Sequence, residues 1–249
     1  MKKPSRIVSV ILIILVVIAA GGYGLFQISK SRSFQFFGGI VQRVNNETKV
    51  VALTFDDGPT KSNTEPILTA LRDLKVKATF FVIGAELRQN MNEGREIAAA
   101  GHELGNHSYS HKRMVLKSLS FIRREIEDTD QLIRGVGYKG PIQFRPPFGK
   151  KLVLLPYYLD QQRRKTILWD VEPDSYPEIA TKPERIVKYT VERARPGSII
   201  LLHVMYKDPK DAVTEIQGIV TSLKKKGYQF KTVSELLEEQ NLLNTKSTK

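Results

Sequence analysis

The stretch VVALTFDDGP, residues 50–59, combines a short apolar run with two adjacent carboxylates and a Gly-Pro turn. A short apolar run that ends at such a turn is typical of a buried strand. Six later segments are further strand candidates: ATFFVIG (78–84), HELGNHS (102–108), IQFR (142–145), TILWD (166–170), SIILLH (198–203) and YQFK (228–231). The chain therefore predicts seven strands from residue 50 onward.

Helical stretches lie between these strands. Ser62 and Glu65 have the spacing of a capping box and predict a helix that runs through Leu74. Further helices are predicted at 86–100, 118–134, 183–194 and 211–226. This alternation predicts an α/β fold with a parallel sheet, either open or closed into a barrel, and seven repeats in about 190 residues favour closure.

The N-terminal segment predicts a membrane helix. Lys2, Lys3 and Arg6 precede an apolar run, residues 7–26, that contains no charged residue. About 20 helical residues cross a bilayer core, and flanking basic residues stay in the cytoplasm. We therefore expect a single-pass protein of the cell membrane whose remaining domain is extracytoplasmic. A cleaved signal peptide and a secreted protein are the alternative, because Ala19 and Ala20 are small.

The predicted domain boundaries follow from this order. Residues 1–6 form the basic cytoplasmic end and 7–27 the transmembrane anchor or signal peptide. A stalk of low periodicity is expected at 28–47, because its composition resembles a linker. One catalytic domain is expected at 48–240 and a polar tail at 241–249. With 249 residues and 41% apolar content, the chain can build one closed core.

The amino-acid composition limits which binding partners and which kinds of catalytic or metal site are expected. The net charge of +13 favours an anionic neighbour, such as an anionic wall polymer or lipid headgroups. The basic residues are spread along the chain rather than gathered in one stripe, so nucleic-acid binding is not expected. The chain has no cysteine, which excludes disulfides, thiolate zinc sites and cysteine nucleophiles. The sequence does not determine the oligomeric state.

Uncommon polar residues fall at the ends of predicted strands. They are Asp56 and Asp57 after the first strand, His107 and His111 after the third, Arg145 at the end of the fourth, and His203 at the end of the sixth. In parallel α/β folds the carboxyl ends of the strands share one rim, where the active site lies. We therefore expect these six side chains to converge.

Three of these side chains have the donor types of a metal site. His107 and His111 are spaced i, i+4, which on a helical turn points both imidazoles to one side. With one carboxylate they supply three ligands and leave a coordination position open, as in catalytic zinc sites. Zn²⁺ is the first expectation, and Co²⁺, Ni²⁺ or Fe²⁺ would also accept this donor set.

Four motifs carry a family resemblance: TFDDGP (54–59), HSYSH (107–111), RPPFG (145–149) and LLH (201–203). In this order and spacing the chain resembles the NodB-type polysaccharide deacetylases, carbohydrate esterase family 4 (CE4), over about residues 48–235. The resemblance implies a distorted (β/α) barrel of about seven parallel strands. It also implies removal of N-acetyl, and in some members O-acetyl, groups from chitin-like polymers, peptidoglycan or xylan.

The resemblance assigns roles to the rim residues. It makes Asp56 the general base, with Arg145 as its partner and His203 as the general acid. Asp57, His107 and His111 become the metal ligands. A backbone N–H in the loop that contains Pro147, Phe148 and Gly149 would stabilise the oxyanion. Phe148 stands where many members have Tyr.

One departure from the family pattern concerns the partner of His203. Many members carry an Asp-Trp pair after the fifth strand, where this chain has Ser175 and Tyr176, with Asp174 one residue earlier. Either Asp174 substitutes through a shifted loop, or His203 lacks its carboxylate partner. Tyr176 is also a candidate for stacking against a sugar ring, whereas Trp169 is expected to pack in the core.

The expected function is removal of N-acetyl groups from N-acetylglucosamine-type polysaccharide, either peptidoglycan or a chitin-like polymer. One alternative is an O-acetyl esterase that acts on wall or xylan-type polysaccharide. A second is a catalytically silent carbohydrate-binding module of the same fold.

Overall fold

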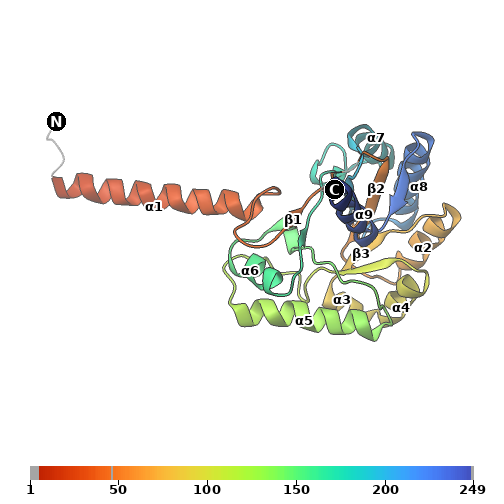
Figure 1. Ribbon diagram of the computed structural model, residues 1–249, viewed down its shortest axis with the longest axis horizontal. Helices are drawn as coiled ribbons and strands as arrows, with labels where there is room; N and C mark the ends of the chain where they lie inside the picture. The colour runs from red at the N-terminus through yellow and green to blue at the C-terminus, as the bar shows by residue number, and fades with distance from the viewer. Residues whose placement is uncertain (1–5, 46, 248–249) are drawn as a thin grey trace.

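The computed structural model describes residues 6–45 and 47–247 (Figure 1). A long helix, α1 (Arg6–Lys30), projects from an α/β domain. Within the described residues, α1 is the one helix long and apolar enough to cross a membrane, a test that a signal sequence also passes. Lys2 and Lys3 of the predicted cytoplasmic end lie outside the described residues.

The centre of the domain is a parallel five-stranded sheet. Its strands are β2 (Val50–Asp56), β3 (Thr79–Val82), β4 (Glu103–Asn106), β6 (Ile199–Leu202) and β7 (Gln229–Lys231). The order is β4-β3-β2-β6, and β7 pairs with the first half of β2. A second parallel pair joins β1 (Ile40–Val41) to β5 (Thr166–Ile167). The expected α/β fold with parallel strands is confirmed.

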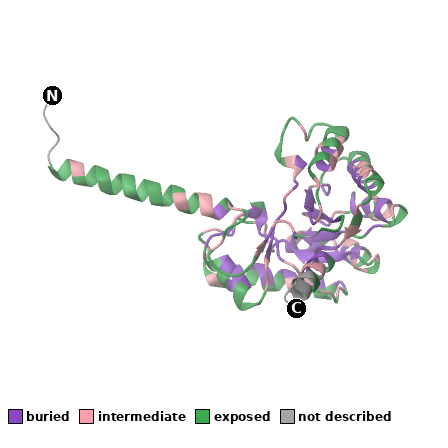
Figure 2. Ribbon diagram, turned by 45° about the horizontal axis from the view of Figure 1, so that its top comes forward, coloured by how far each residue is buried: buried purple, intermediate pink, exposed green. Residues whose placement is uncertain are grey.

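Helices cover the sheet. They are α2 (Thr64–Asp73), α3 (Gly84–Gln89), α4 (Met91–Ala99), α5 (Leu119–Gly135), α6 (Leu154–Gln161), α7 (Pro183–Arg193), α8 (Pro209–Lys225) and α9 (Val233–Ser247), with short 3₁₀ turns at Pro147–Gly149 and Pro173–Ser175. Buried residues follow the strands and the inner faces of these helices, whereas α1 is exposed along most of its length (Figure 2).

Successive side chains of β2 point to opposite faces of the sheet, and this alternation decides which of them reach the rim of the site. Val51, Leu53 and Phe55 pack under the helices, in the larger apolar cluster. Residues of the opposite parity point to the other face of the sheet. Thr54 and Asp56 therefore share one buried face.

Six of the seven predicted strands contain an observed strand, but residues 142–145 do not. There only Phe144 pairs, as an isolated bridge to Asn106 on one side and Thr166 on the other. Pro146 and Pro147 follow, and proline cannot donate a ladder hydrogen bond, so the strand cannot continue. Val171 makes a further bridge to Ile200. Closure into a seven-stranded barrel stays a prediction.

The predicted capping box at Ser62 is wrong. Helix α2 begins at Thr64, and its cap residue Asn63 makes no side-chain cap hydrogen bond. Asn63 instead donates to the carbonyl oxygens of Val204 and Lys207, which ties this turn to the loop after β6. The predicted helix at 86–100 is two helices, α3 and α4, separated at Asn90.

The predicted stalk at 28–47 also differs from the structure. Helix α1 continues through Lys30, and Ser29 at its end is buried. Val41 and Val44 are buried in a second core cluster that also contains residues of β5 and α9. Apolar side chains that cover a sheet edge are stabilised by removal from water, so this segment packs on the domain instead of leaving it. The predicted tail likewise continues α9 to Ser247, and residues 248–249 lie outside the described part.

Candidate active site

All six polar residues predicted at strand ends meet on one rim. Asp56 closes β2, and His107 and His203 follow β4 and β6 directly. Arg145 follows the bridge residue Phe144. Ion-pair distances link five of them to one another, and His203 lies close enough to Asp56 and Asp57 for both charges to raise its pKa. The ends of β2, β4 and β6, together with the segment after Phe144, therefore bring these six side chains to one rim.

Three of the residues form a cluster of metal-ligand type. Asp57 Oδ1 lies 3.5 Å from His111 Nε2 and 4.0 Å from His107 Nε2. One ligand atom from each of the three residues lies within 4.8 Å of the others. Asp57 Oδ1 is also buried and has no hydrogen-bond partner among the described residues. A buried carboxylate oxygen without a donor, facing two imidazole nitrogens, fits a divalent cation.

The two histidines converge through a loop and not through the helical turn that their spacing suggested. Residues 107–111 have no helical assignment, and both Ser108 (φ 66°) and His111 (φ 53°) adopt left-handed backbone. The Asn106 side chain holds the turn by accepting a hydrogen bond from Ser108 N at 2.8 Å. Asp57 (φ 71°) and Gly58 (φ 68°) make a similar left-handed turn directly after β2.

His107 is oriented and kept neutral by its surroundings. Its Nδ1 lies 2.8 Å from the Arg145 carbonyl oxygen, so Nε2 faces the two aspartates. Burial lowers the pKa of His107 to about 3, against an opposing effect of Asp57. A neutral imidazole whose Nδ1–H is held by a carbonyl offers the Nε2 lone pair to a metal.

Asp56 differs from its neighbour Asp57 because Arg145 holds it in an ion pair. Arg145 Nη1 donates to Asp56 Oδ1 at 2.5 Å and to Thr54 Oγ1 at 2.9 Å. The guanidinium is fully buried between the rings of Phe81 and Trp169 and also donates to the Leu168 carbonyl at 3.2 Å. Burial lowers the pKa of Arg145, and the ion pair with Asp56 opposes this. Asp56 is therefore held in an ion pair beside, and not within, the metal-ligand cluster.

Asp174 is the carboxylate partner of His203. Its Oδ2 accepts from His203 N at 2.8 Å and lies 3.4 Å from His203 Nδ1. Burial by itself would lower the pKa of His203, but Asp174 and the two rim aspartates raise it to about 9. Asp174, and not Ser175, therefore lies beside His203, which is the geometry that the first of the two alternatives requires.

Two charged residues missed by the sequence reasoning support this pair. Lys207 Nζ lies 2.8 Å from Asp174 Oδ1 and 2.8 Å from Glu215 Oε1. Burial acts to raise the pKa of Asp174, yet His203 and Lys207 lower it to about 2. A charged residue on the otherwise apolar inner face of α8, Glu215, was the available sequence indication.

Aromatic side chains line the open side. Phe148 is 52% exposed, and its ring centroid lies 4.7 Å from that of His111. Pro147 and Gly149 beside it are buried. Tyr176 is 43% exposed and packs on Tyr189. Trp169 is buried as predicted and donates to Glu172 at 2.8 Å.

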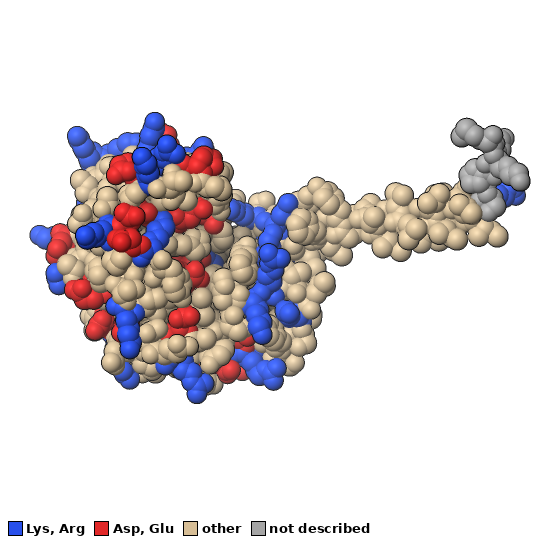
Figure 3. Space-filling view, turned by 180° about the vertical axis from the view of Figure 1, so that it is seen from behind, with Lys and Arg blue, Asp and Glu red and all other residues tan. Residues whose placement is uncertain are grey.

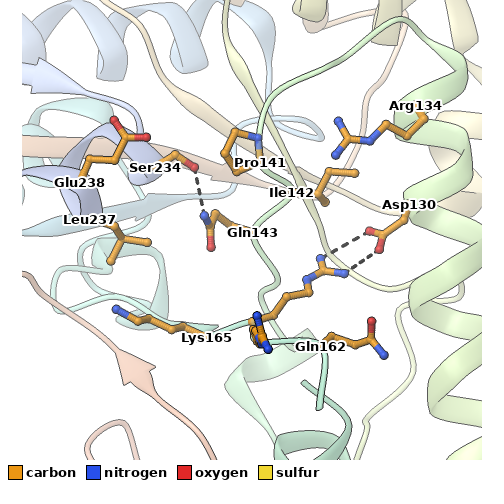
Figure 4. A pocket seen from close by; sticks show the side chains of 12 residues that line it. Asp130, Arg134, Pro141, Ile142, Gln143, Gln162, Lys165, Ser234, Leu237 and Glu238 are labelled. Carbon is orange, nitrogen blue, oxygen red and sulfur yellow. Dashed lines mark hydrogen bonds and ion pairs between the residues drawn. The ribbon is translucent and has the colours of Figure 1, made fainter. Parts of the chain in front are cut away.

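A cavity of about 550 Å³ lies elsewhere (Figure 4). It is lined by parts of α5 and α9 and by residues 141–143 and 162–165, which precede the bridge residue Phe144 and β5. Asp130 and Arg164 form an ion pair in it, while Lys165 and Glu238 extend along its sides. None of the six rim residues lines this cavity, so it is separate from the candidate active site.

Comparison with known proteins gives the family. A family model described as polysaccharide deacetylase matches residues 43–164. A peptidoglycan-N-acetylglucosamine deacetylase of Bacillus cereus is 34% identical over 200 residues, which cover 80% of this chain and 93% of that protein. This chain belongs to the polysaccharide deacetylase family. The four ordered motifs therefore identified the family correctly.

Two further relatives show the range within the family. The peptidoglycan-N-acetylmuramic acid deacetylase PdaC of Bacillus subtilis is 34% identical over 79% of this chain and 40% of its own length. The structure of a CE4 family pseudoenzyme from Bacillus anthracis is 28% identical, with a TM-score of 0.70, over 79% of this chain and 68% of that chain. The chain thus has the CE4 fold and deacetylase relatives, and the family includes an inactive member.

Proposed function

We propose that this family member is a metal-dependent hydrolase that removes N-acetyl groups from N-acetylglucosamine-type wall polysaccharide, either peptidoglycan or a chitin-like polymer. The observation that carries the proposal is the unpartnered, buried Asp57 Oδ1, which faces two imidazoles beside a separately paired aspartate. Asp57 can thus act as a metal ligand, while the adjacent Asp56 can act as a base. The naming of the Bacillus cereus relative as a peptidoglycan-N-acetylglucosamine deacetylase supports the substrate class.

Asp57, His107 and His111 are the proposed ligands, with Zn²⁺ as the first candidate and Co²⁺, Ni²⁺ or Fe²⁺ as alternatives. When bound, such an ion supplies Lewis acidity, which lowers the pKa of water and polarises an acetyl carbonyl. CE4 members are in general metal-dependent, and the donor set of this chain fits that requirement.

Asp56 is the proposed general base. Its Oδ2 lies 3.5 Å from His107 Nε2, so it borders the ligand cluster, while Oδ1 is held by Arg145. The ion pair orients the Asp56 carboxylate, which favours acceptance of a proton from attacking water. Arg145 is a positioning residue for this base, since its donors end on Asp56, Thr54 and Leu168.

His203 is the proposed general acid. An amine is a poor leaving group unless it is protonated, and His203 can donate that proton. Asp174, whose other oxygen is held by Lys207, engages Nδ1 of the imidazole, and Nε2 is left for the substrate. A backbone N–H of the loop at Pro147, Phe148 and Gly149 is the proposed oxyanion donor. Exposed Phe148 and Tyr176 are proposed to contact sugar rings.

The proposed location is the outer face of the cell membrane, with α1 as a single-pass anchor and the catalytic domain, assigned to residues 48–240, outside. Secretion after removal of the N-terminal segment is the alternative. An anionic wall polymer is a proposed neighbour because of the net charge of +13.

Acetate release tests the proposal. The full chain in detergent is incubated with N-acetylglucosamine oligomers, isolated peptidoglycan or acetylated xylan, with chelator or with added Zn²⁺ or Co²⁺. Metal-dependent acetate with free amine on the glycan supports N-deacetylation. Acetate from xylan alone favours the O-acetyl esterase. Glycan binding without acetate under every metal favours the silent module; the Bacillus anthracis relative is described as a pseudoenzyme.

A further inference from the structure

Three chain segments form one surface around the base of α1. We call residues 30–39, 112–118 and 148–159 the basal collar. Together these segments contain Lys30, Arg32, Lys112, Arg113, Lys117, Lys150 and Lys151, and they contain no Asp or Glu. Arg32 pairs with Glu172, and Lys151 is buried, so the other five cations remain near the surface.

Direct contacts join the three segments. Phe37 packs edge-on against Tyr157 at 5.5 Å between centroids. Arg113 lies over the ring of Phe148, 5.3 Å from its centroid. Leu116 and Lys117 line a shallow cavity of about 320 Å³ with Leu152, Val153 and Leu154. The basal collar is therefore one continuous surface assembled from distant parts of the sequence.

The basal collar exposes apolar side chains between its cations. Leu116 is 88% exposed, and Phe34, Phe36 and Phe37 are 40–49% exposed. Val153, Leu154 and Tyr157 of the third segment are exposed to a similar extent. Contiguous apolar residues rimmed by cations mark an interaction site, and aromatic rings with Lys and Arg are typical of the bilayer interface.

The contacts of α1 place the basal collar at the helix end. Lys151 N donates to Ser29 O at 3.0 Å, and Lys151 Nζ donates to Ser31 O. Lys30 and Lys150 both lie over the ring of Phe26, at 4.8 and 5.3 Å. In Figure 1, α6 lies on the side of the domain that α1 leaves, and Figure 3 shows Lys and Arg in a band where α1 meets the domain.

We propose that the basal collar is a docking surface for an anionic lipid bilayer, which holds the catalytic domain directly on the membrane. This rests on the proposed role of α1 as an uncleaved anchor. Because the helix runs into the domain through Ser29 and Lys151 instead of a free linker, a membrane crossed by α1 meets the basal collar. The exposed rings of Phe34, Phe36, Phe37 and Tyr157 then enter the interface, and the cations contact lipid phosphates.

Docking would restrict which glycan is reached. Phe148 belongs to the basal collar and also packs on the proposed metal ligand His111. The open side of the site therefore adjoins the docking surface. The enzyme would act on acetylated glycan close to the bilayer, not on polymer deep in a wall.

Site-specific labels can measure docking, because the chain has no cysteine. Phe36→Cys and Leu116→Cys, each carrying a fluorophore, report on the basal collar, and Thr221→Cys on α8 is the matched control. The full chain is reconstituted in phosphatidylcholine vesicles, with or without phosphatidylglycerol, that contain a headgroup-level quencher. We expect strong quenching of the labels at positions 36 and 116 when phosphatidylglycerol is present, and little quenching of the label at position 221. Equal, weak quenching at all three positions would overturn the proposal.

Charge reversal gives a second readout. Lys30→Glu with Lys117→Glu is expected to lower the docked-to-undocked ratio by about five-fold or more. The control, Lys188→Glu with Lys225→Glu, changes the net charge equally on α7 and α8 and should leave quenching unchanged. Equal loss in both variants would contradict a localised surface. Acetate release from soluble oligomers, measured in parallel, separates failure of docking from failure of the proposed activity.

Discussion

Asp174 Oδ2 accepts a hydrogen bond from His203 N and lies 3.4 Å from His203 Nδ1, although Asp174 stands one residue before the family position. Asp174 lies in the 3₁₀ turn Pro173–Ser175, and contact of this turn with β6 brings the carboxylate to His203 at the end of that strand. Lys207 holds the other carboxylate oxygen at 2.8 Å. The acid of the proposed mechanism thus has a carboxylate partner that direct alignment misses.

Asp174→Asn should shift the alkaline limb of the pH profile of kcat/KM to lower pH. Asp174 is the largest of the effects that raise the pKa of His203, opposing burial, to about 9. Loss of that carboxylate lowers the pKa of His203, so the protonated acid disappears at a lower pH. The log of kcat/KM against pH should fall earlier in the variant than in the parent chain. An unchanged alkaline limb would remove His203 from the acid role.

The same pair predicts a pH effect on stability. The pKa of His203 in the folded chain lies above its ordinary value of 6.5. Its contribution to stability is therefore complete below about 6.5 and is lost as pH rises through about 9. Urea midpoints measured across this window should fall for the parent chain and fall less for Asp174→Asn.

Because Asp56 and Asp57 have different proposed roles, substitution of Asp56 should affect turnover without affecting metal binding. Asp56→Asn is expected to keep the metal and lose turnover by at least about 100-fold, because the proposed base is gone while Asp57, His107 and His111 remain. His111→Ala should lose metal and turnover together. For each variant, metal content is measured by mass spectrometry and acetate release is measured on the same samples. Retained turnover in Asp56→Asn would exclude the base role.

Arg145→Ala should destabilise the chain even without substrate. It leaves Asp56 buried and unpaired and withdraws donors from Thr54 and Leu168. Loss of one partner of a buried pair costs about 3 to 5 kcal/mol. Denaturant unfolding measures this, with exposed Arg72→Ala as the control, where a cost below about 1 kcal/mol is expected. Similar costs for both would mean that Arg145 does not support the buried face.

Removal of the segment expected to be a stalk should also cost stability. A chain that begins at residue 48 lacks the buried Val41 and Val44 and the β1–β5 pair. Each fully buried valine contributes about 1.5 to 3 kcal/mol. A chain that begins at residue 28 keeps these contacts and serves as the control. Equal melting temperatures would restore the interpretation of 28–47 as a free stalk.

The sequence alone determined the family, the parallel α/β fold and the six rim residues. Those conclusions depend on local patterns: short apolar runs, and polar residues at the positions where the runs end. Alternation along β2 even fixes that Thr54 and Asp56 share a face, because side chains alternate along any strand.

Only the tertiary structure decided the remaining features. His107 and His111 converge through left-handed turns, which residue spacing does not encode. The Asp174–Lys207–Glu215 chain joins a 3₁₀ turn, a loop and a helix through contacts that exist only after packing. Residues 28–47 looked like a linker because only a few apolar side chains anchor them. Burial of those side chains depends on surfaces supplied by β5, α9 and the Trp169 region, far along the chain.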